Sequence, residues 1–385
     1  MQKIRILIVD DSVVIRRMLM DALASDPCFE IAGAAANGRI ALSKIPQVNP
    51  DLVTLDVEMP EMDGLEALAA LRKLYPKLPV IMFSTLTERG AEATLDALSL
   101  GANDYVTKPA NVGGLDTALK RVRDELIPKV KALCMPAAQT PALFPRPPAL
   151  AAAGLKPAVE PLRRPPVRLD VLAIGVSTGG PNALGELVPQ LPADLPVPVV
   201  IVQHMPPIFT RFLAERLASR SKVTVVEGAP GLVLTAGQVV IAPGDYHMVV
   251  ERQGLKVLIG THQQPPENSC RPSVDVLFRS VAAAYGPHTL GLIMTGMGQD
   301  GLRGCGNIRE AGGQILAQDQ ATSVVWGMPG FVAEAGLADK VLPLSDLAVE
   351  IMRRVDQFRG SARTAPSQVG SGSQAGQFPR MAGNR

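Results

Sequence analysis

The chain has 385 residues, enough for two or three domains, and 47% hydrophobic with 19% charged residues is typical of a soluble globular protein. Its formal net charge is only +2, and no basic stripe with interleaved aromatic residues appears, so nucleic-acid binding is not expected. The four cysteines are scattered, and no apolar segment approaches the ~18–20 residues that cross a bilayer. These features, with an N-terminal stretch typical of a strand rather than a signal peptide, predict a cytoplasmic protein with reduced thiols.

The first part of the chain alternates between apolar runs of strand length and segments with helical periodicity. The expected strands are 4–9, 31–35, 51–56, 79–84 and 104–109, and the expected helices are 13–23, 38–45, 65–74, 91–100 and one from about residue 115. Five strand–helix units predict a five-stranded parallel sheet that is covered by helices on both faces. In such a sheet, functional residues collect at the carboxyl ends of the strands.

Charged and hydroxyl side chains follow four of these expected strands. Asp10 and Asp11 end the first strand, Asp56 the third, Ser84 the fourth and Lys108 the fifth. Three carboxylates brought together repel one another unless a cation is present, and hard oxygen ligands suit Mg²⁺, which readily bridges to a phosphate. A nearby lysine and hydroxyl would then hold phosphoryl oxygens. The alternative is that these residues are ordinary solvated loop ends, which is the better explanation for any one of them alone.

The composition changes near residue 135, where a stretch rich in proline and alanine has neither strand nor helix periodicity. We interpret it as an extended linker. The last residues are rich in glycine, serine, alanine and glutamine, which predicts a disordered tail. The expected organisation is a first domain at 1–125, a linker at 126–168, a second domain at 169–358 and a tail at 359–385.

The second domain also alternates. The expected strands are 171–176, 198–205, 223–227 and 314–318, with a strand and turn at 289–298 and a hairpin-like insert at 233–250. The expected helices are 208–217, 273–285, 301–311, 346–358 and one from about residue 181. This pattern predicts a doubly wound, mainly parallel α/β domain.

The stretch G-V-S-T-G-G follows the first strand of this second domain and admits three interpretations. A phosphate-binding loop would need a G-x-x-x-x-G-K-[ST] or G-x-G-x-x-G pattern, and both are missing. A plain strand–helix turn needs a glycine or two but no serine between them. The third interpretation is a nucleophile turn, because Gly175, Ser177 and Gly179 match G-x-S-x-G and place a hydroxyl at a helix start.

A serine nucleophile needs a base, and the base needs an orienting carboxylate. The chain has four histidines, of which His204 ends the next strand at the same expected sheet edge as Ser177. Asp300 lies on a glycine-rich turn, T-G-M-G-Q-D-G, after a strongly apolar strand. A strand-end histidine is often structural, and an aspartate at this place is often a helix N-cap. The order Ser177, His204, Asp300 differs from that of ordinary α/β-hydrolases, which indicates a different fold with convergent geometry.

The first ~125 residues, with D-D, D-V-E-M-P-E-M-D-G and T-K-P at successive strand ends, resemble a response-regulator receiver domain. The resemblance implies that Asp56 accepts phosphate from a sensor histidine kinase and that Asp10 and Asp11, with Asp56, hold Mg²⁺. It implies a switch at the phosphorylation site formed by Ser84, Tyr105 and Lys108.

The motifs G-V-S-T-G-G, Q-H-M-P, C-R-P-S-V-D-V-L-F-R-S and T-G-M-G-Q-D-G resemble, in this order, the catalytic domain of the chemotaxis protein-glutamate methylesterase family. The resemblance implies a catalytic triad of Ser177, His204 and Asp300, which needs no cofactor for the esterase chemistry. It also makes Thr178 and the backbone of Met297 candidates for positioning and for the oxyanion hole.

The family resemblance implies a phosphorylation-regulated hydrolase that demethylates glutamate γ-methyl esters on chemoreceptors, releasing methanol, and deamidates certain receptor glutamines. Its expected partners are methyl-accepting chemoreceptors and a histidine kinase, with no contact to the membrane except through those receptors. The receiver is expected to cover the serine site until Asp56 is phosphorylated. Two alternatives remain: a regulated hydrolase for another ester or amide, and a regulator whose second domain only docks a partner.

Overall fold

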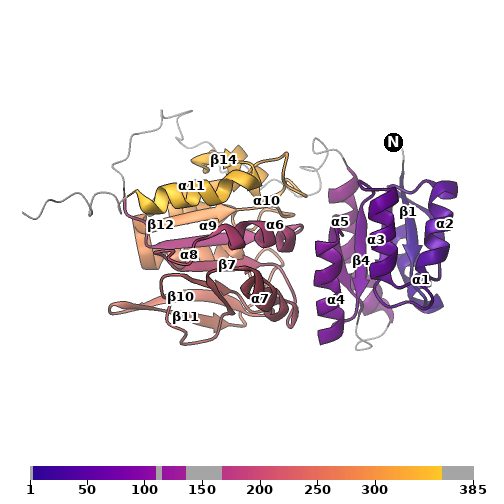
Figure 1. Ribbon diagram of the computed structural model, residues 1–385, viewed down its shortest axis with the longest axis horizontal. Helices are drawn as coiled ribbons and strands as arrows, with labels where there is room; N and C mark the ends of the chain where they lie inside the picture. The colour runs from indigo at the N-terminus through magenta and orange to yellow at the C-terminus, as the bar shows by residue number, and fades with distance from the viewer. Residues whose placement is uncertain (1–2, 110–114, 136–166, 358–385) are drawn as a thin grey trace, which may run out of the picture.

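The protein, described by a computed structural model over residues 3–109, 115–135 and 167–357, forms two α/β units that lie side by side (Figure 1). Most of the expected linker at 126–168 and the whole expected tail at 359–385 lie outside these residues. No helix in the described ranges is both long enough and apolar enough to span a membrane.

The first unit is a receiver-like sheet with five helices. Its elements are β1 (Ile4–Val9), α1 (Val13–Ala24), β2 (Phe29–Ala35), α2 (Gly38–Val48), β3 (Leu52–Asp56), α3 (Gly64–Leu74), β4 (Val80–Ser84), α4 (Glu88–Ser99), β5 (Asp104–Thr107) and α5 (Leu115–Cys134). The strands are parallel in the order β2-β1-β3-β4-β5. Helices α1 and α5 pack on one face, and α2, α3 and α4 on the other. The predicted five-stranded parallel architecture is confirmed, and α5 continues through the predicted domain boundary at residue 125.

Local sequence signals fix where these helices begin. The residues that precede four of the helices each accept a hydrogen bond from the backbone two or three residues into the helix, which satisfies a donor that the helix itself leaves free. These N-caps are Ser12, Asn37, Asp63 and Thr87. At α3 the capping is reciprocal, because Glu66 also accepts from the backbone of Asp63.

The second unit is a seven-stranded parallel sheet with helices on both faces. Its elements are β6 (Val171–Val176), α6 (Gly180–Leu187), η2 (Val188–Gln190), β7 (Val199–Gln203), α7 (Phe209–Arg220), β8 (Thr224–Glu227), β9 (Gln238–Ile241), β10 (His247–Gln253), β11 (Lys256–His262), α8 (Val274–Tyr285), η3 (Gly286–His288), β12 (Thr289–Ile293), α9 (Leu302–Glu310), β13 (Gln314–Gln318), α10 (Met328–Glu334), β14 (Lys340–Leu342) and α11 (Leu344–Asp356). The strand order is β14-β13-β12-β6-β7-β9-β8. Helices α6, α7 and α11 pack on one face, while α8, α9, α10 and the β10–β11 hairpin cover the other. The predicted doubly wound fold is confirmed.

The predicted hairpin-like insert at 233–250 is wrong in its extent. Residues 238–241 form β9, which lies inside the parallel sheet between β7 and β8, and the hairpin is formed instead by β10 and β11. Val239, Val240 and Ile241 are all fully buried. A continuous apolar run, rather than alternation, is typical of a strand that is covered on both faces, and this distinguishes β9 from a hairpin arm.

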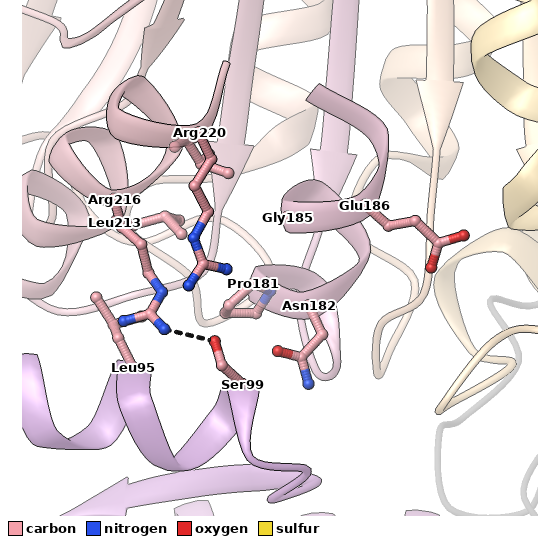
Figure 2. Close-up of a pocket in the computed structure, with 10 residues that line it drawn as sticks. Leu95, Ser99, Pro181, Asn182, Gly185, Glu186, Leu213, Arg216 and Arg220 are labelled. Carbon is pink, nitrogen blue, oxygen red and sulfur yellow. Dashed lines mark hydrogen bonds between the residues drawn. The ribbon is translucent and has the colours of Figure 1, made fainter. Parts of the chain in front are cut away.

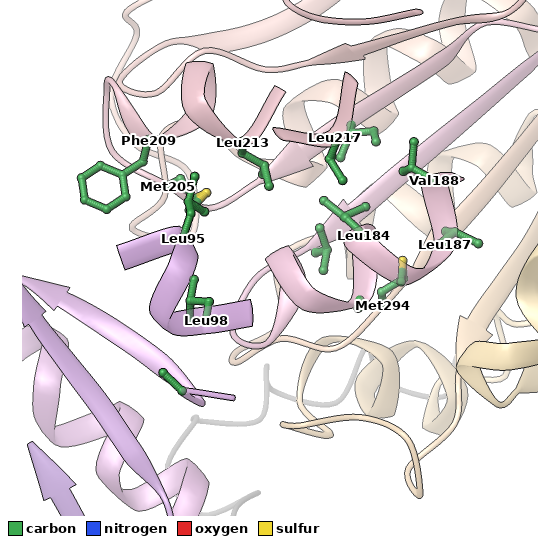
Figure 3. Close-up of a cluster of buried hydrophobic side chains, with 14 of the residues drawn as sticks. Leu95, Leu98, Leu184, Leu187, Val188, Met205, Phe209, Leu213, Leu217 and Met294 are labelled. Atoms are coloured by element: carbon green, nitrogen blue, oxygen red, sulfur yellow. The ribbon is translucent and has the colours of Figure 1, made fainter. Parts of the chain in front are cut away.

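The two units share one apolar core across their boundary. Leu95 and Leu98 of α4 belong to the same buried cluster as Leu184 of α6 and Leu213 of α7 (Figure 3). Within this cluster, the ring of Tyr105 stacks on that of Phe209, with 5.0 Å between centroids and 7° between planes. Burial of leucine side chains on this scale is the dominant favourable contribution to such a contact. The receiver-like unit is therefore docked on the second unit through α4 and the start of β5.

Polar contacts surround this shared core. Arg216 of α7 pairs with Asp96 of α4 at 2.6 Å and also donates to Ser99 Oγ at 2.8 Å, while Asn182 of α6 donates to the Leu98 carbonyl at 2.8 Å. A cavity of about 390 Å³ opens between α4, α6 and α7 beside these contacts (Figure 2). The cavity lining does not include the residues that the sequence singled out for catalysis.

The close approach of α6 to β7 yields a stability prediction at Gly180. A Cβ atom there would lie 1.9 Å from Gln203 Oε1 and 2.7 Å from a methyl of Val176. We expect Gly180→Ala to lower the free energy of unfolding of the second unit by about 1–3 kcal/mol, because the packed neighbours must shift.

The matched control is Gly185→Ala in the same helix, where an added Cβ meets no atom within 4 Å. That substitution should stabilise the helix by about 0.5–1 kcal/mol. Guanidinium unfolding followed by the fluorescence of Trp326, the single tryptophan, reports on this unit alone. Equal effects of the two substitutions would contradict the packing argument.

Candidate active site and receiver site

Three loops meet where the strand order of the larger sheet reverses. The chain leaves β6 and crosses to β7 on one side, whereas β12 lies on the other side of β6. Ser177 directly follows β6, His204 directly follows β7, and Asp300 lies on the turn after β12. In open parallel sheets this reversal creates a crevice at the carboxyl ends of the strands, where ligands bind. The structure therefore brings the three predicted residues to one edge of the sheet.

The turn that carries Ser177 is fixed by its backbone. Ser177 N donates to the Thr295 carbonyl at 3.0 Å, and the Ser177 carbonyl accepts from Gly180 N at 2.8 Å. Gly179 has a φ of +78°, a conformation that favours glycine. The loop after β12 also approaches closely, because a Cβ atom on Gly296 would lie 2.8 Å from Ser177 Cβ. These two constraints account for the second glycine of G-x-S-x-G and the first glycine of the T-G-M-G motif.

Asp300 is the most heavily hydrogen-bonded side chain of the site. Its carboxylate is buried and accepts six hydrogen bonds, each of 2.6–3.1 Å. The donors are His204 Nε2, Asn268 Nδ2, Ser273 Oγ and the backbone N–H groups of Val274, Asp275 and Gly301. Two of these donors belong to the first turn of α8, so Asp300 caps α8 from outside that helix. The sequence-based alternative of an N-cap for its own helix does not hold, because α9 begins after Gly301.

Hydrogen bonds keep the side chain of Asp300 ionised although it is buried. Burial alone would raise the pKa of the carboxyl group, but the hydrogen bond and charge of His204 and the backbone donors of α8 outweigh it and lower the pKa. The helix N-terminus adds partial positive charge at the same place. Asp300 is thus held as a carboxylate, which can only accept hydrogen bonds.

His204 is oriented by this carboxylate. Its Nε2 lies 2.8 Å from Asp300 Oδ2 and must carry the proton of that hydrogen bond, which leaves Nδ1 as the basic nitrogen. Nδ1 lies 3.6 Å from the sulfur of Cys270. In the described part of the chain, no hydrogen bond joins the imidazole to Ser177 Oγ. In unliganded sites such catalytic hydrogen bonds are often long and tighten only in the complex.

The charge environment stabilises the imidazolium that forms when Nδ1 takes up a proton. Burial would lower the pKa of His204, but negative charge on Cys270 and the hydrogen bond to Asp300 outweigh burial and raise the pKa to about 10. An imidazolium formed between these two groups is therefore strongly stabilised. This is the species that appears when a histidine takes a proton from a nucleophile.

Thr178 and Met297, the supporting residues predicted from the family resemblance, occupy different places. Thr178 is buried, and its hydroxyl donates to Asp104 Oδ2 of the receiver-like unit at 2.8 Å. Met297 is half-buried on the turn after β12, where a Cβ on Gly327 would lie 3.2 Å from its Cα. Thr178 thus links the serine turn directly to the other unit.

Sequence reasoning assigned no role to the residues around Asp300 and His204. Asn268, Cys270 and Ser273 all come from one run, E-N-S-C-R-P-S-V-D, which leads into the first turn of α8. Part of this run served as a family motif. The sequence feature that could have identified these residues is their position directly before a helix start, where polar side chains often interact with the backbone N–H groups of the first turn.

The second predicted site lies at the carboxyl edge of the receiver-like sheet. Asp10, Asp11 and Asp56 have carboxylate oxygens within 4.8 Å of one another. Lys108 Nζ lies 2.7 Å from Asp56 Oδ2 and 3.1 Å from Asp10 Oδ2. Ser84 is also buried at this edge, where its hydroxyl donates to the Gly90 carbonyl at 3.0 Å. The structure therefore gathers the five predicted residues at one sheet edge.

Burial and the negative charge of a neighbouring carboxylate both raise the pKa of Asp56. Burial first, and then the negative charge of Asp10, raise the pKa of Asp56 to about 7, although Lys108 opposes both. One ammonium group cannot neutralise three carboxylates. This excess of negative charge on hard oxygen ligands fits a divalent cation such as Mg²⁺.

Tyr105, the predicted switch aromatic, lies at the boundary of the two units. Its ring is buried and stacks on Phe209, while Lys129 donates to its carbonyl oxygen at 2.6 Å. It therefore does not face the carboxylate cluster in this structure. A change in the docking of the two units would therefore alter the contact of Tyr105 with Phe209.

Comparison with known proteins matches both units. Residues 6–120 match the model of the response regulator receiver domain, and residues 172–351 match that of CheB methylesterase. The proteins named protein-glutamate methylesterase/protein-glutamine glutaminase from Trichodesmium erythraeum and Nocardioides sp. are 55% and 52% identical, over 92% and 97% of this chain and 100% of their own lengths. The protein of the same name from Pyrococcus abyssi is 41% identical, over 93% of this chain and 95% of its own.

Identity of this extent covers both units and every motif quoted above. On this evidence from fold, site and sequence, the chain belongs to the protein-glutamate methylesterase/protein-glutamine glutaminase family.

Proposed function

We propose that this protein is a phosphorylation-regulated hydrolase that removes methyl groups from glutamate γ-methyl esters of chemoreceptors and deamidates specific receptor glutamines, with Ser177 as its nucleophile. The observation that carries the proposal is the convergence of Ser177, His204 and Asp300 at the strand-order reversal, with Asp300 holding His204 through Nε2 at 2.8 Å. The family relationship supplies the substrate class.

The proposed reaction follows from the roles that these groups can take. Ser177 Oγ attacks the ester carbonyl carbon while His204 Nδ1 accepts the hydroxyl proton. Asp300 stabilises the resulting imidazolium and holds its orientation. The imidazolium then protonates the departing methoxide, methanol leaves, and water hydrolyses the acyl-enzyme to free glutamate. With a glutamine side chain the same steps release ammonia. Thr178 and Met297 remain candidates for positioning and for the oxyanion hole.

Regulation is proposed to begin at Asp56, with a sensor histidine kinase as phosphodonor. Asp10, Asp11 and Asp56 would hold Mg²⁺, which screens the negative charge as a phosphoryl group arrives. Lys108 would pair with the phosphoryl oxygens, and Ser84 and Tyr105 would complete the switch. No cofactor is assigned to the esterase step. The receiver contacts the serine turn through Thr178, which supports the hypothesis that docking limits access to Ser177.

The first test concerns the nucleophile. Ser177→Ala should lower methanol release from methylated receptor by at least about a thousandfold, because the covalent step is lost. Ser219→Ala, on the exposed surface of α7, serves as a matched control and should keep full activity. Unchanged fluorescence of Trp326 would confirm that both variants fold. Full activity of the Ser177 variant would refute the assignment.

The second test concerns docking. Arg216→Asp places a carboxylate against Asp96, so it should weaken the contact of α4 with α7 and raise the activity of the unphosphorylated protein by about two- to fivefold. Adding Asp96→Arg to this variant reverses both charges and should return activity to the original level.

Arg17→Asp is the control for the added negative charge, because Arg17 lies on α1 with 76% of its side chain exposed. Initial rates of methanol release, measured without phosphodonor, distinguish the variants. An unchanged rate in Arg216→Asp would argue against docking as the restraint, as would an increase that persists in the double variant.

The third test concerns Mg²⁺. Protons and Mg²⁺ compete for Asp56, whose pKa is raised to about 7, so Mg²⁺ affinity should rise as the pH rises through that value. Calorimetric titration should give a dissociation constant for Mg²⁺ that is about tenfold larger at about pH 6 than at about pH 8. Asp56→Asn should remove this dependence. Asp51→Asn, at the other end of the same strand, should keep it; a flat profile in the original protein would contradict the proposed ligand set.

A further inference from the structure

Cys270 lies against the basic nitrogen of His204, and the proposed reaction gives this thiol no role. The distance from Cys270 Sγ to His204 Nδ1 is 3.6 Å, and Asp300 holds the other ring nitrogen at 2.8 Å. Sulfur, imidazole and carboxylate therefore form a second nucleophile–base–carboxylate series that shares its base with Ser177. The contact between the Cys270 thiol and His204 Nδ1 occupies the nitrogen that would accept the proton of the Ser177 hydroxyl.

The atom that can accept the proton of the Cys270 thiol is Nδ1 of His204. Because Nε2 donates to Asp300, Nδ1 is the acceptor, and the Cys270 S–H group lies within hydrogen-bonding distance of it. Transfer of this proton gives a thiolate next to an imidazolium whose far side faces a carboxylate. Each ion of such a pair would stabilise its neighbour. Cys270 is half-buried, so small reagents can reach it.

The same residues do not suit a metal ion. His204, Cys270 and Asp300 offer ligand atoms within 4.8 Å of one another. However, the Asp300 carboxylate already accepts six hydrogen bonds, and its partners on α8 would lose them if it turned towards a cation. Cysteine and aspartate also face opposite nitrogens of the imidazole. The arrangement is thus suited to proton transfer.

We propose that Cys270 is a reactive modification site, in which His204 activates the thiol towards soft electrophiles and hydrogen peroxide and in which the modified sulfur blocks the esterase. With iodoacetamide, the thiolate forms a C–S bond as the C–I bond breaks and iodide leaves. With hydrogen peroxide, an S–O bond forms and the O–O bond breaks. The sulfur is oxidised to a sulfenic acid, and the hydroxide that departs takes the proton from the imidazolium to give water.

The other three cysteines provide internal references. Cys305 is fully buried. Burial and the negative charge of Asp51 raise the pKa of Cys134 to about 12, so its thiolate is scarce at neutral pH. Cys28 is half-buried like Cys270 but lies in the receiver-like unit, away from the chain's histidines. Only Cys270, among the four described cysteines, faces an imidazole nitrogen.

Loss of activity on modification rests on the proposed function, because it requires His204 to be the base for Ser177. A group attached to Cys270 would occupy the space at Nδ1 and hold His204 away from the serine. Reactivity of the thiol requires only the geometry of the sulfur and the imidazole. The two parts are therefore measured separately.

The first measurement follows labelling of the full-length protein by iodoacetamide at neutral pH, with the rate at each cysteine obtained by mass spectrometry. Cys270 should react at least about tenfold faster than Cys28 and Cys134. His204→Gln should slow labelling of Cys270 about tenfold and leave Cys28 unchanged. A Cys270 rate no faster than that of Cys28, or unaffected by His204→Gln, would overturn the proposal.

The second measurement follows methanol release during the same labelling. Activity should fall in step with modification of Cys270, whereas Cys270→Ala, compared with its own untreated sample, should be insensitive to iodoacetamide. Cys28→Ala should remain as sensitive as the original protein. Complete labelling with full retained activity would overturn the blocking role. Failure of the proposed function itself would appear differently, as methanol release that survives Ser177→Ala.

Discussion

The buried carboxylate of Asp300 is the constraint on which the rest of the active site depends. It caps α8 from a different loop and holds His204 in place, so one side chain fixes both a helix start and an imidazole. A buried carboxylate that lost these donors would be costly, since hydrogen bonds to a charged group contribute about 1.5–3 kcal/mol each. The fold therefore orients the imidazole with interactions that it needs for its own stability. The orientation of the imidazole therefore needs no interaction beyond those that stabilise the fold.

The two units are connected at the residue next to the nucleophile. Asp104 begins β5 and accepts from Thr178, while Lys108 follows the same strand and pairs with Asp56. A strand of four residues thus separates the ion pair of the receiver site from the turn that carries Ser177. A phosphoryl group on Asp56 that moves Lys108 towards its oxygens would act on a strand whose other end is held by the second unit. The proposed regulation therefore requires only a short structural connection between Asp56 and the turn that carries Ser177.

Much of this architecture could be predicted from sequence because the relevant signals are local. Apolar runs and helical periodicity identify the strands and helices, and parallel topology then brings strand ends such as those of Ser177 and His204 together. What sequence could not provide was contact between distant segments. The interpretation of β9 as a hairpin arm is wrong because β9 pairs in parallel with β7, 40 residues earlier (Val199 with Val239), and with β8, 14 residues earlier (Thr224 with Gln238). The role of Cys270 depends on a loop that folds back over His204. The contacts of Cys270 are set by tertiary packing, which no local pattern encodes.

In the proposed mechanism, His204 is the base for both the Ser177 hydroxyl and the Cys270 thiol. Asp300 fixes the ring through Nε2, so Nδ1 is available to only one partner at a time. With the receiver docked, that partner is Cys270. In the proposed reaction, attack by Ser177 requires Nδ1 to leave the sulfur, and a bound ester that brings the serine hydroxyl to the imidazole competes directly with the thiol. The resting contact of His204 with Cys270 thus sets a threshold that substrate binding must overcome before the base is free.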